Sequence, residues 1–435
     1  MDISIGFWLL CLFLLMTALS VPIAVAIALS SLIIMFTILP FDVAVMTAGQ
    51  KMVTGVDSFS LLAIPFFILA GNIMNRGGIA ARLVNFAKLL VGRLPGSLSQ
   101  VNVLSNMMFG SVSGSAVAAA AAVGKTLSPQ IEKEGYDKSF TTAVNVASCP
   151  AGLLIPPSNS LIVFSVVSGG TSVAALFIAG YVPGILMGLS CMLVAYFIAK
   201  RKGYGVQTYQ RPTFSQVLTT LWQALPSLGL IVVVIGGITG GVFTATEGAC
   251  IAVLYALTLS LCYRSLSIKD IKTICIESTE ITAIMLFLIG ASTIMSWAMA
   301  FTGLPTLISD WMLSISDNPI MIFILMNIIL LVVGMFMDLT PALLIFTPIF
   351  MPIANQLGMH DVHFAMMIIF NLCIGIATPP VGTALFVGCS VSGAKIEQVI
   401  KAIWPFCAVL IATLMLITFI PDISLFLPRL FGLIP

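Results

Sequence analysis

The chain has 435 residues, of which 60% are hydrophobic and only 8% are charged, whereas about 25% are charged in a typical soluble domain. Many apolar runs reach about 20 residues, the length that crosses the hydrocarbon core of a bilayer. With a net charge of +2, the chain has too few cations to bind nucleic acid through a basic surface. The composition therefore predicts an all-α, polytopic membrane protein in contact with a lipid bilayer.

The N-terminal run from Ile3 to Pro40 is too long for one ordinary span, and we predict two helices that meet near Pro22. The N-terminus lacks the positive region of a cleaved signal peptide, which favours a retained first helix. The nine cysteines are scattered singly without any CxxC pair, so the sequence indicates neither a disulfide framework nor a zinc site.

Lysine and arginine gather in a few segments, which the positive-inside rule assigns to the cytoplasm. These segments are Arg76 to Arg93, Lys125 to Lys138, Lys200 to Arg211, Arg264 to Lys272, and Lys395 to Lys401. Helices at roughly 224–243 and 247–263 then connect two cytoplasmic clusters, and a helix at about 280–300 leads outward. We expect an outer loop from Thr302 to Pro319, because it carries Asp310 and Asp317 but no cation.

Two segments do not fit as ordinary spans, because both ends of each lie on one side of the membrane. The segment 94–133 has cytoplasmic ends and the centre GSVSGSAV, whereas 319–358 has outer ends and the centre GMFMDLTP. Each arm has about 16 residues, which is short for a full crossing. We therefore predict two re-entrant helical hairpins, one from each face; the alternative is two pairs of short complete helices.

Each hairpin precedes a helix that two adjacent prolines interrupt. GLLIPPSNS lies within a helix predicted at 139–168, and GIATPPVGT lies within one at 364–391. A proline inside a helix costs about 3 kcal/mol, because it removes a donor and clashes with the preceding turn. Such breaks persist at membrane depth only where protein or a water-filled cavity covers the backbone. We predict two broken helices.

The two halves match in sequence at a nearly constant offset of 223 or 224 residues, although one hairpin enters from each face. This pattern predicts an inverted-topology repeat, the usual plan of secondary transporters. The matched pairs are Gly110/Gly334, Pro129/Pro352, Gly135/Gly358, Gly152/Gly375, Pro156/Pro379, Pro157/Pro380, Ser168/Ser392 and Gly169/Gly393.

The breaks free carbonyl oxygens, which together with hydroxyl groups suit a hard cation such as sodium, while half-helix N-termini attract an anion. We predict one sodium site formed by Ser111, Ser113, Ser115, Gly152, Ile155 and Pro157. We predict a second formed by Gly334, Asp338, Thr340, Gly375, Thr378 and Pro380. The alternatives are close packing for the serines and a helix N-cap for Asp338.

A polar cavity between the two cation sites is the predicted place for substrate. Its candidate residues are Ser158, Asn159, Ser160 and Thr383, directly after the proline pairs. The sequence indicates no cofactor apart from sodium as the coupling ion.

Three other function classes fit less well. An intramembrane serine protease needs a base beside its nucleophile, and both histidines, His360 and His363, are expected in one solvated outer loop. A channel needs a continuous pore, whereas an inverted repeat favours alternating access. A proton-coupled carrier needs intramembrane carboxylates, and Asp338 is the main candidate.

Four motifs resemble, in order, the large permease subunit of TRAP (tripartite ATP-independent periplasmic) transporters. They are GSVSGSAVAAAAAVG, GLLIPPSNSLIV, GMFMDLTPALLIFTPIFMPIA and NLCIGIATPPVGTALFV. The resemblance covers essentially the whole chain and is greatest for sialic acid systems, with C4-dicarboxylate or another carboxylate as the alternative substrate. It implies a non-enzymatic symporter of the bacterial inner membrane, which takes up an organic acid with sodium and without ATP.

The resemblance also implies two protein partners and an elevator-type fold similar to that of the ion transporter superfamily. A periplasmic binding protein delivers the substrate, and a small four-helix membrane subunit is expected as a separate chain, because this sequence begins directly with the large-subunit pattern. The expected domains are N-terminal scaffold helices 1–58, a transport repeat 59–172, central scaffold helices 173–279, a second transport repeat 280–395, and a C-terminal scaffold helix 396–435.

Overall fold

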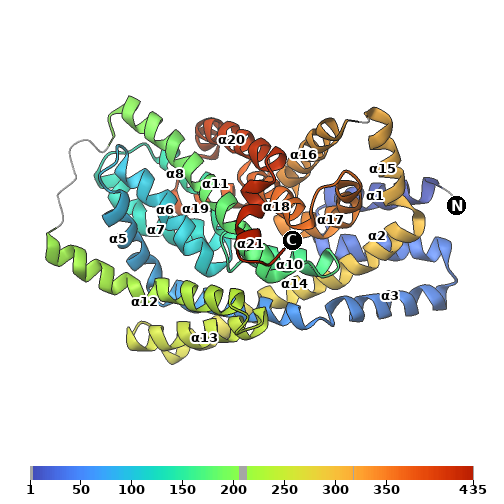
Figure 1. Cartoon of the computed structure of the whole chain (residues 1–435), viewed down its shortest axis with the longest axis horizontal. Helices are drawn as coiled ribbons and strands as arrows, with labels where there is room; N and C mark the ends of the chain where they lie inside the picture. The colour runs from blue at the N-terminus through green and yellow to red at the C-terminus, as the bar shows by residue number, and fades with distance from the viewer. Residues whose placement is uncertain (1–2, 205–212, 317, 435) are drawn as a thin grey trace.

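The computed structural model describes residues 3–204, 213–316 and 318–434, and in these ranges every regular element is a helix (Figure 1). Eight of the described helices are long and apolar enough to cross a membrane, or nine if one bent pair counts as a single span. The predicted class, an all-α polytopic membrane protein, is confirmed. Arg211 and Asp317 lie outside the described residues.

Prolines separate the N-terminal helices. The predicted break at Pro22 is confirmed, because it separates α1 (Ile3–Ala18) from α2 (Ile23–Ile38). Pro40 then precedes a helix that the sequence did not delimit. The elements before the first hairpin are α3 (Phe41–Val56), the 3₁₀ turn η1 (Phe59–Leu62), α4 (Ala63–Arg76) and α5 (Ile79–Val91). Gly78 directly before α5 and Gly96 directly before α6 have φ near +70°, a conformation that glycine adopts without strain, so the chain turns sharply before each of these helices.

The predicted first hairpin consists of α6 (Ser97–Ser113) and α7 (Ala116–Lys133). Gly114 turns the chain between them with φ of +62°, and the Ser115 hydroxyl caps α7 by accepting a hydrogen bond from a backbone N–H at 3.3 Å. At 1.5 Å per residue, each arm is about 26 Å long, slightly less than the thickness of a hydrocarbon core.

The first broken helix follows as α8 (Lys138–Ser148), α9 (Ala151–Leu154) and α10 (Asn159–Val167). Its axis bends by 51° across the break, which contains the cis-linked Pro156 and Pro157. The predicted interruption is confirmed. The helix α11 (Val173–Lys202) then leads to the basic segment at Lys200.

In the central region the predicted pair of helices is confirmed as α12 (Phe214–Thr239) and α13 (Ala245–Cys262), although α12 begins at residue 214 and not near 224. Two other expectations are wrong. α14 (Ile268–Thr302) begins well before residue 280, because Ser267 and Asp270 form a capping box there. The expected outer loop is mostly the helix α15 (Leu304–Ile315), which buries Leu304 and Met312 and includes Asp310.

The last third of the chain repeats the hairpin and the broken helix, and then ends in two helices. Its elements are α16 (Pro319–Phe336), α17 (Leu339–Gln356), α18 (Asp361–Ala377), α19 (Thr383–Ser392), α20 (Ile396–Phe419) and α21 (Asp422–Leu430). The single C-terminal helix that we expected is divided, because Pro421 cannot continue the hydrogen-bond ladder of α20.

The two histidines do not share a solvated loop. His360 is the N-cap of α18, whereas His363 lies within that helix and is only 3% exposed. The Nε2 atom of His363 lies 2.8 Å from the carbonyl oxygen of Ile417 on α20. The expectation of a solvated His363 is therefore wrong, because one ring nitrogen finds a backbone partner in the interior.

The inverted repeat extends over nearly the whole described chain. The starts of α5 and α15 differ by 225 residues (79 and 304), those of α6 and α16 by 222 (97 and 319), and those of α11 and α20 by 223 (173 and 396). The packing partners correspond as well. The contact of α4 with α13 is equivalent to the contact of α14 with α2, and the contact of α10 with α17 is equivalent to that of α19 with α7. The halves therefore interlock, with each broken helix packed on the hairpin of the other half.

Three expected domain boundaries coincide with helix starts, but the boundary between residues 279 and 280 falls inside the continuous helix α14. α14 packs on α2, α3 and α4, and α4 in turn packs on α13. By contrast, α11 and α20 pack on each other and on α8 and α18. The contacts therefore group α4 and all of α14 with the N-terminal and central helices, and they group α11 and α20 with the broken helices.

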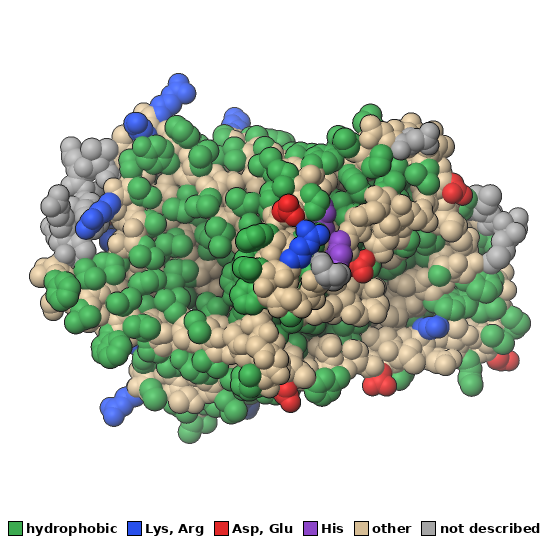
Figure 2. Space-filling view, viewed as in Figure 1, with side chains coloured by type: hydrophobic (Ala, Val, Ile, Leu, Met, Phe, Trp, Pro, Cys, Tyr) green, Lys and Arg blue, Asp and Glu red, His purple; other side chains and the backbone are tan. Residues whose placement is uncertain are grey.

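Hydrophobic side chains are spread over the face of the molecule in Figure 2, where charged side chains are few. Large hydrophobic side chains such as Phe214, Trp222 and Ile268 are 80%, 74% and 87% exposed, which suits contact with lipid or another membrane subunit. On the face in Figure 2, lysine and arginine lie mainly toward the left end, where Figure 1 places α5, α6 and α12. Basic segments that are distant in the sequence thus come together in space, in agreement with one cytoplasmic side.

Candidate functional site

The first hairpin tip and the first helix break meet through two glycines. A Cβ on Gly152 would lie 2.2 Å from the Cα of Gly110, and a Cβ on Gly110 would lie 2.6 Å from the Cα of Gly152. Since Cβ atoms essentially never approach backbone atoms within 3.0 Å, only glycine fits at either position. The tip of α6 thereby covers the backbone around the start of the break.

The three serines of the predicted first sodium site have different surroundings. The Ser111 hydroxyl donates to a carbonyl oxygen of its own helix at 2.8 Å, and Ser115 is occupied in capping α7. Ser113 lies at the tip, where its hydroxyl donates weakly to the Ser115 carbonyl oxygen at 3.3 Å. The backbone of Ser113 also lies against α4, since a Cβ on Gly71 would come within 2.7 Å of the Ser113 carbonyl oxygen.

Asn159 provides a free acceptor at this junction. It is 7% exposed, and among the described residues its Oδ1 has no hydrogen-bond partner. Its side-chain amide lies beside Gly114, where the Pro157 carbonyl oxygen also approaches. A buried acceptor without a partner is costly, and a hard cation with oxygen ligands would satisfy it. Ile155 is extended at the break and apolar, so only its backbone can contribute.

The second half repeats the glycine contact. A Cβ on Gly375 would lie 2.6 Å from the Cα of Gly334 and 2.7 Å from its carbonyl oxygen. In addition, the Val381 N–H donates to the Met335 carbonyl oxygen at 3.3 Å, which joins the second break to the second tip. The two junctions thus use the same backbone-to-backbone contact at equivalent positions.

Asp338 occupies the N-cap position of α17, but its side chain makes no capping hydrogen bond. It instead accepts a hydrogen bond from the Thr383 hydroxyl at 3.2 Å, which connects the tip to α19. Asp338 is exposed, so its charge is not sealed from solvent. The Thr378 hydroxyl donates to a carbonyl oxygen of its own helix at 2.6 Å, whereas Thr340 beside the tip is half-buried.

Two carbonyl oxygens converge at Gly382, just after the second proline pair. A Cβ on Gly382 would lie 2.8 Å from the Thr378 oxygen and 3.1 Å from the Ile376 oxygen. The intervening peptide between Pro379 and Pro380 is cis, and Pro380 is exposed. These carbonyls and the Asp338 carboxylate give the second junction a set of oxygen acceptors suited to a cation.

The predicted substrate residues do not share one environment. Ser158, Asn159 and Ser160 are all buried, and the Ser158 hydroxyl donates to the Leu153 carbonyl oxygen across the break. Ser160 is 3.2 Å from Ser158 and is directed to the same carbonyl. These two hydroxyls therefore provide hydrogen-bond donors for the Leu153 carbonyl oxygen at the break, while the Thr383 hydroxyl contacts Asp338 at the second tip.

Two buried asparagine pairs are part of the junctions but were missed in the sequence. The Asn106 amide on α6 donates to the Asn145 side-chain oxygen on α8 at 2.9 Å. The Asn371 amide on α18 donates to the Asn327 side-chain oxygen on α16 at 2.8 Å. Each pair joins a hairpin arm to a broken helix. The signal available in the sequence was a lone asparagine within an apolar run for Asn145, Asn327 and Asn371, whereas Asn106 follows Asn102 by four residues.

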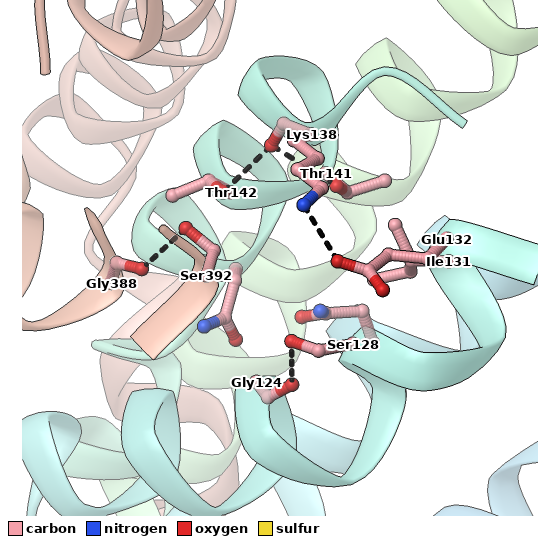
Figure 3. Close-up of a pocket in the computed structure, with 11 residues that line it drawn as sticks. Gly124, Ser128, Ile131, Glu132, Lys138, Thr141, Thr142, Gly388 and Ser392 are labelled. Carbon is pink, nitrogen blue, oxygen red and sulfur yellow. Dashed lines mark hydrogen bonds and ion pairs between the residues drawn. The ribbon is translucent and has the colours of Figure 1, made fainter. Parts of the chain in front are cut away.

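A small polar pocket, shown in Figure 3, lies where α7, α8 and α19 meet. The Lys138 ammonium and the Glu132 carboxylate form an ion pair there at 2.6 Å, with both side chains about half-exposed. Ser128 and Ser392 line the pocket but donate to carbonyl oxygens of their own helices, at Gly124 and Gly388. The pocket thus marks the place where α19 of the second repeat packs into the first.

The sequence is similar to those of membrane transport proteins along almost its whole length. A family model described as "Tripartite ATP-independent periplasmic transporter, DctM component" matches residues 10–423. A Salmonella typhimurium protein named YgiK is 54% identical over 420 residues, which cover 97% of this chain and 96% of that protein. The sialic acid TRAP transporter large permease SiaM of Vibrio cholerae is 38% identical, covering 91% and 92%. The C4-dicarboxylate TRAP transporter large permease DctM of Rhodobacter capsulatus is 35% identical, covering 95% and 96%.

Among solved structures, the YdaH transporter of Alcanivorax borkumensis has a similar fold, with a TM-score of 0.60. It is 13% identical, and the alignment covers 86% of this chain and 88% of that one, so the likeness concerns the fold alone. The matched family model spans almost the whole chain, including both junctions. The chain therefore belongs to the DctM family as the large permease of a tripartite ATP-independent periplasmic transporter, a multi-pass inner-membrane protein and not an enzyme.

Proposed function

We propose that this permease takes up an organic acid together with sodium, with sialic acid (N-acetylneuraminate) as the first candidate substrate. The observation that carries the proposal is the repeated junction, in which a hairpin tip meets a helix break at a glycine pair beside oxygen acceptors. The first sodium ion would bind among Ser113, Pro157 and Asn159, and the second among Asp338, the carbonyls near Gly382 and Thr340.

Sialic acid is favoured because the sialic acid permease SiaM is 38% identical to this chain. The C4-dicarboxylate permease DctM at 35% keeps dicarboxylates as the alternative. Both substrates carry a carboxylate. The N-termini of α10 and α19, which begin directly after the two breaks, would direct their positive dipole ends toward it.

Membership of a tripartite family implies two partners, a periplasmic binding protein and a small membrane subunit. We propose that α1–α4 and α12–α14 form a fixed scaffold, and that the hairpins, the broken helices, α11 and α20 move against it as an elevator. This revises the expected boundaries at residues 58 and 279, and it also moves α11 and α20 from the expected scaffold to the moving part. It is supported by the packing of α4 on α13, of α14 on α2, and of α11 on α20. The helices α5 and α15 would connect the two parts.

Uptake into proteoliposomes tests this function. The vesicles contain this chain and its small subunit, and the purified binding protein is added outside with radiolabelled N-acetylneuraminate. We expect accumulation with an inward sodium gradient and little without it. Equal uptake with potassium in place of sodium would contradict sodium coupling. Sodium-dependent uptake of radiolabelled succinate, with no uptake of radiolabelled N-acetylneuraminate under the same conditions, would contradict the sialic acid assignment and favour a dicarboxylate.

A further inference from the structure

A cavity of about 420 Å³ lies between α3, α10, α14 and α17, at the end of α10 remote from its break. Small-molecule sites typically enclose about 300–1,000 Å³, so this cavity has room for a small organic acid. α3 and α14 contribute a polar wall, and α10 and α17 contribute apolar side chains such as Val167 and Pro348. The cavity therefore separates scaffold helices from transport helices in the division proposed above.

The polar wall carries one cation and no carboxylate. Lys51 lines the cavity from α3, and none of the other residues around the cavity is acidic. Within the described ranges, no ion pair or hydrogen bond engages the Lys51 ammonium. An ammonium at such a position, half-buried and unneutralised, favours an anion in the adjacent space.

Two further donors in the same wall are unused. Ser296 and Trp297 line the cavity from α14, and neither the hydroxyl nor the indole N–H has a hydrogen-bond partner in the part of the chain that the structure describes. Indole can only donate, and an ammonium can only donate. Together with Lys51 they give the wall three donor groups without a partner in the described chain, which is the complement of a carboxylate.

The hydroxyls of Ser292 and Thr293 in the same wall form hydrogen bonds to backbone carbonyl oxygens. The Thr293 hydroxyl donates to the Lys51 carbonyl oxygen at 2.9 Å, so α14 fixes the backbone of the residue that carries the charge. The approach is close because Gly55 faces Thr293, and a Cβ there would lie 2.4 Å from that side chain. Ser292 donates to its own helix at 2.7 Å. The position of Lys51 is therefore set by packing between two helices.

We propose that this cavity binds the carboxylate of the transported acid, with Lys51, Ser296 and Trp297 as its donors. The assignment rests on the proposed uptake of an organic acid and adds a binding position on the scaffold side, separate from the two helix breaks. The apolar wall from α17 belongs to the second hairpin, so movement of the hairpin changes the shape of the cavity while the donors stay on α3 and α14. The scaffold thus contributes to specificity for an acid, at a position separate from the helix N-termini beside the breaks.

Charge replacement at residue 51 tests the proposal in the proteoliposome assay. Lys51→Gln removes the cation at similar length, and we expect the KM for N-acetylneuraminate to rise about tenfold or more, with the sodium concentration for half-maximal uptake unchanged. Lys51→Arg should retain most of the affinity because it keeps the charge. The matched control is Lys272→Gln, which removes an exposed cation from the cytoplasmic end of α14 and should leave the KM unchanged.

Chemical rescue separates charge from folding. In a background with the exposed Cys262 and Cys275 replaced by serine, Lys51→Cys is treated with methanethiosulfonates. The aminoethyl reagent restores a cation and should restore uptake, whereas the sulfonatoethyl reagent should not. Wild-type uptake with an unaltered KM in Lys51→Gln would overturn the cavity assignment alone. Absence of sodium-dependent uptake by the wild type would instead overturn the proposed function.

Discussion

At the residue scale, four glycines determine how the helix breaks are covered. Gly110 with Gly152, and Gly334 with Gly375, bring two backbones together at distances that no side chain permits. The freed carbonyls of a broken helix remain stable inside a membrane protein only if protein or water covers them.

The glycine contact predicts a strong effect of a single methyl group. Gly152→Ala places a Cβ 2.2 Å from the Gly110 Cα, so the tip must move away from the break. We expect a loss of about 1–3 kcal/mol in stability and a larger loss of uptake, because the acceptors separate. Thermal unfolding in detergent and proteoliposome uptake measure the two effects. Gly236→Ala is the control, since nothing lies within 4 Å of its Cβ position, and normal activity of Gly152→Ala would contradict the account.

The sequence predicted these glycines and the proline pairs, because such residues are conspicuous inside apolar runs. It did not predict the role of Asn106, Asn371 or Lys51. A single amide or cation in a long helix has no periodic signature, and its partner lies on a helix that is distant in the chain. Ser111 and Ser115 were predicted as ligands from their place in the hairpin centre, and in the structure their hydroxyls also form hydrogen bonds within their own hairpin, which the sequence did not indicate.

At the scale of the helix, the hairpins are tied to the broken helices by buried amides. Asn371→Ala removes the donor from the Asn327 side-chain and carbonyl oxygens on α16. We expect a loss of about 0.5–2 kcal/mol, the range for polar contacts between membrane helices. Thermal unfolding measures it, and Asn355→Ala on the exposed face of α17 is the control. Equal stability of the two variants would show that the Asn371–Asn327 pair does not stabilise the contact between α18 and α16.

Helix ends were the least predictable part of the fold. α14 begins about twelve residues before the expected position, because the charged segment from Arg264 to Lys272 was assigned to the cytoplasm. In the structure Glu277 pairs with Arg76 at the end of α4, so the helix extends beyond its apolar part. Hydropathy locates the apolar core of a helix, whereas capping and ion pairs set its ends.

At the scale of the molecule, the interlocked repeats support motion of the hairpins as one unit. A cysteine at Met337, on the second tip, reports which side of the membrane the tip faces. We expect a membrane-impermeant thiol reagent to modify it from one face at rest and from the other face during turnover. The buried Cys149, Cys191 and Cys373 should stay unreactive once the exposed cysteines are replaced. Reactivity from one face under all conditions would contradict an elevator.

The close approach of Gly71 to Ser113 has a consequence for the energy of the transport cycle. The position 224 residues later, Met295 on α14, carries a long buried side chain. Suppose that in the other end state of transport the second tip packs on α14, as the first tip packs on α4 in this structure. The Met295 side chain then keeps the second tip further from α14 than the first tip is from α4. The two end states then differ in free energy, and we expect the empty carrier to populate mainly the state with the first tip against α4. Bound ions and substrate must supply the difference, which limits futile cycling without cargo.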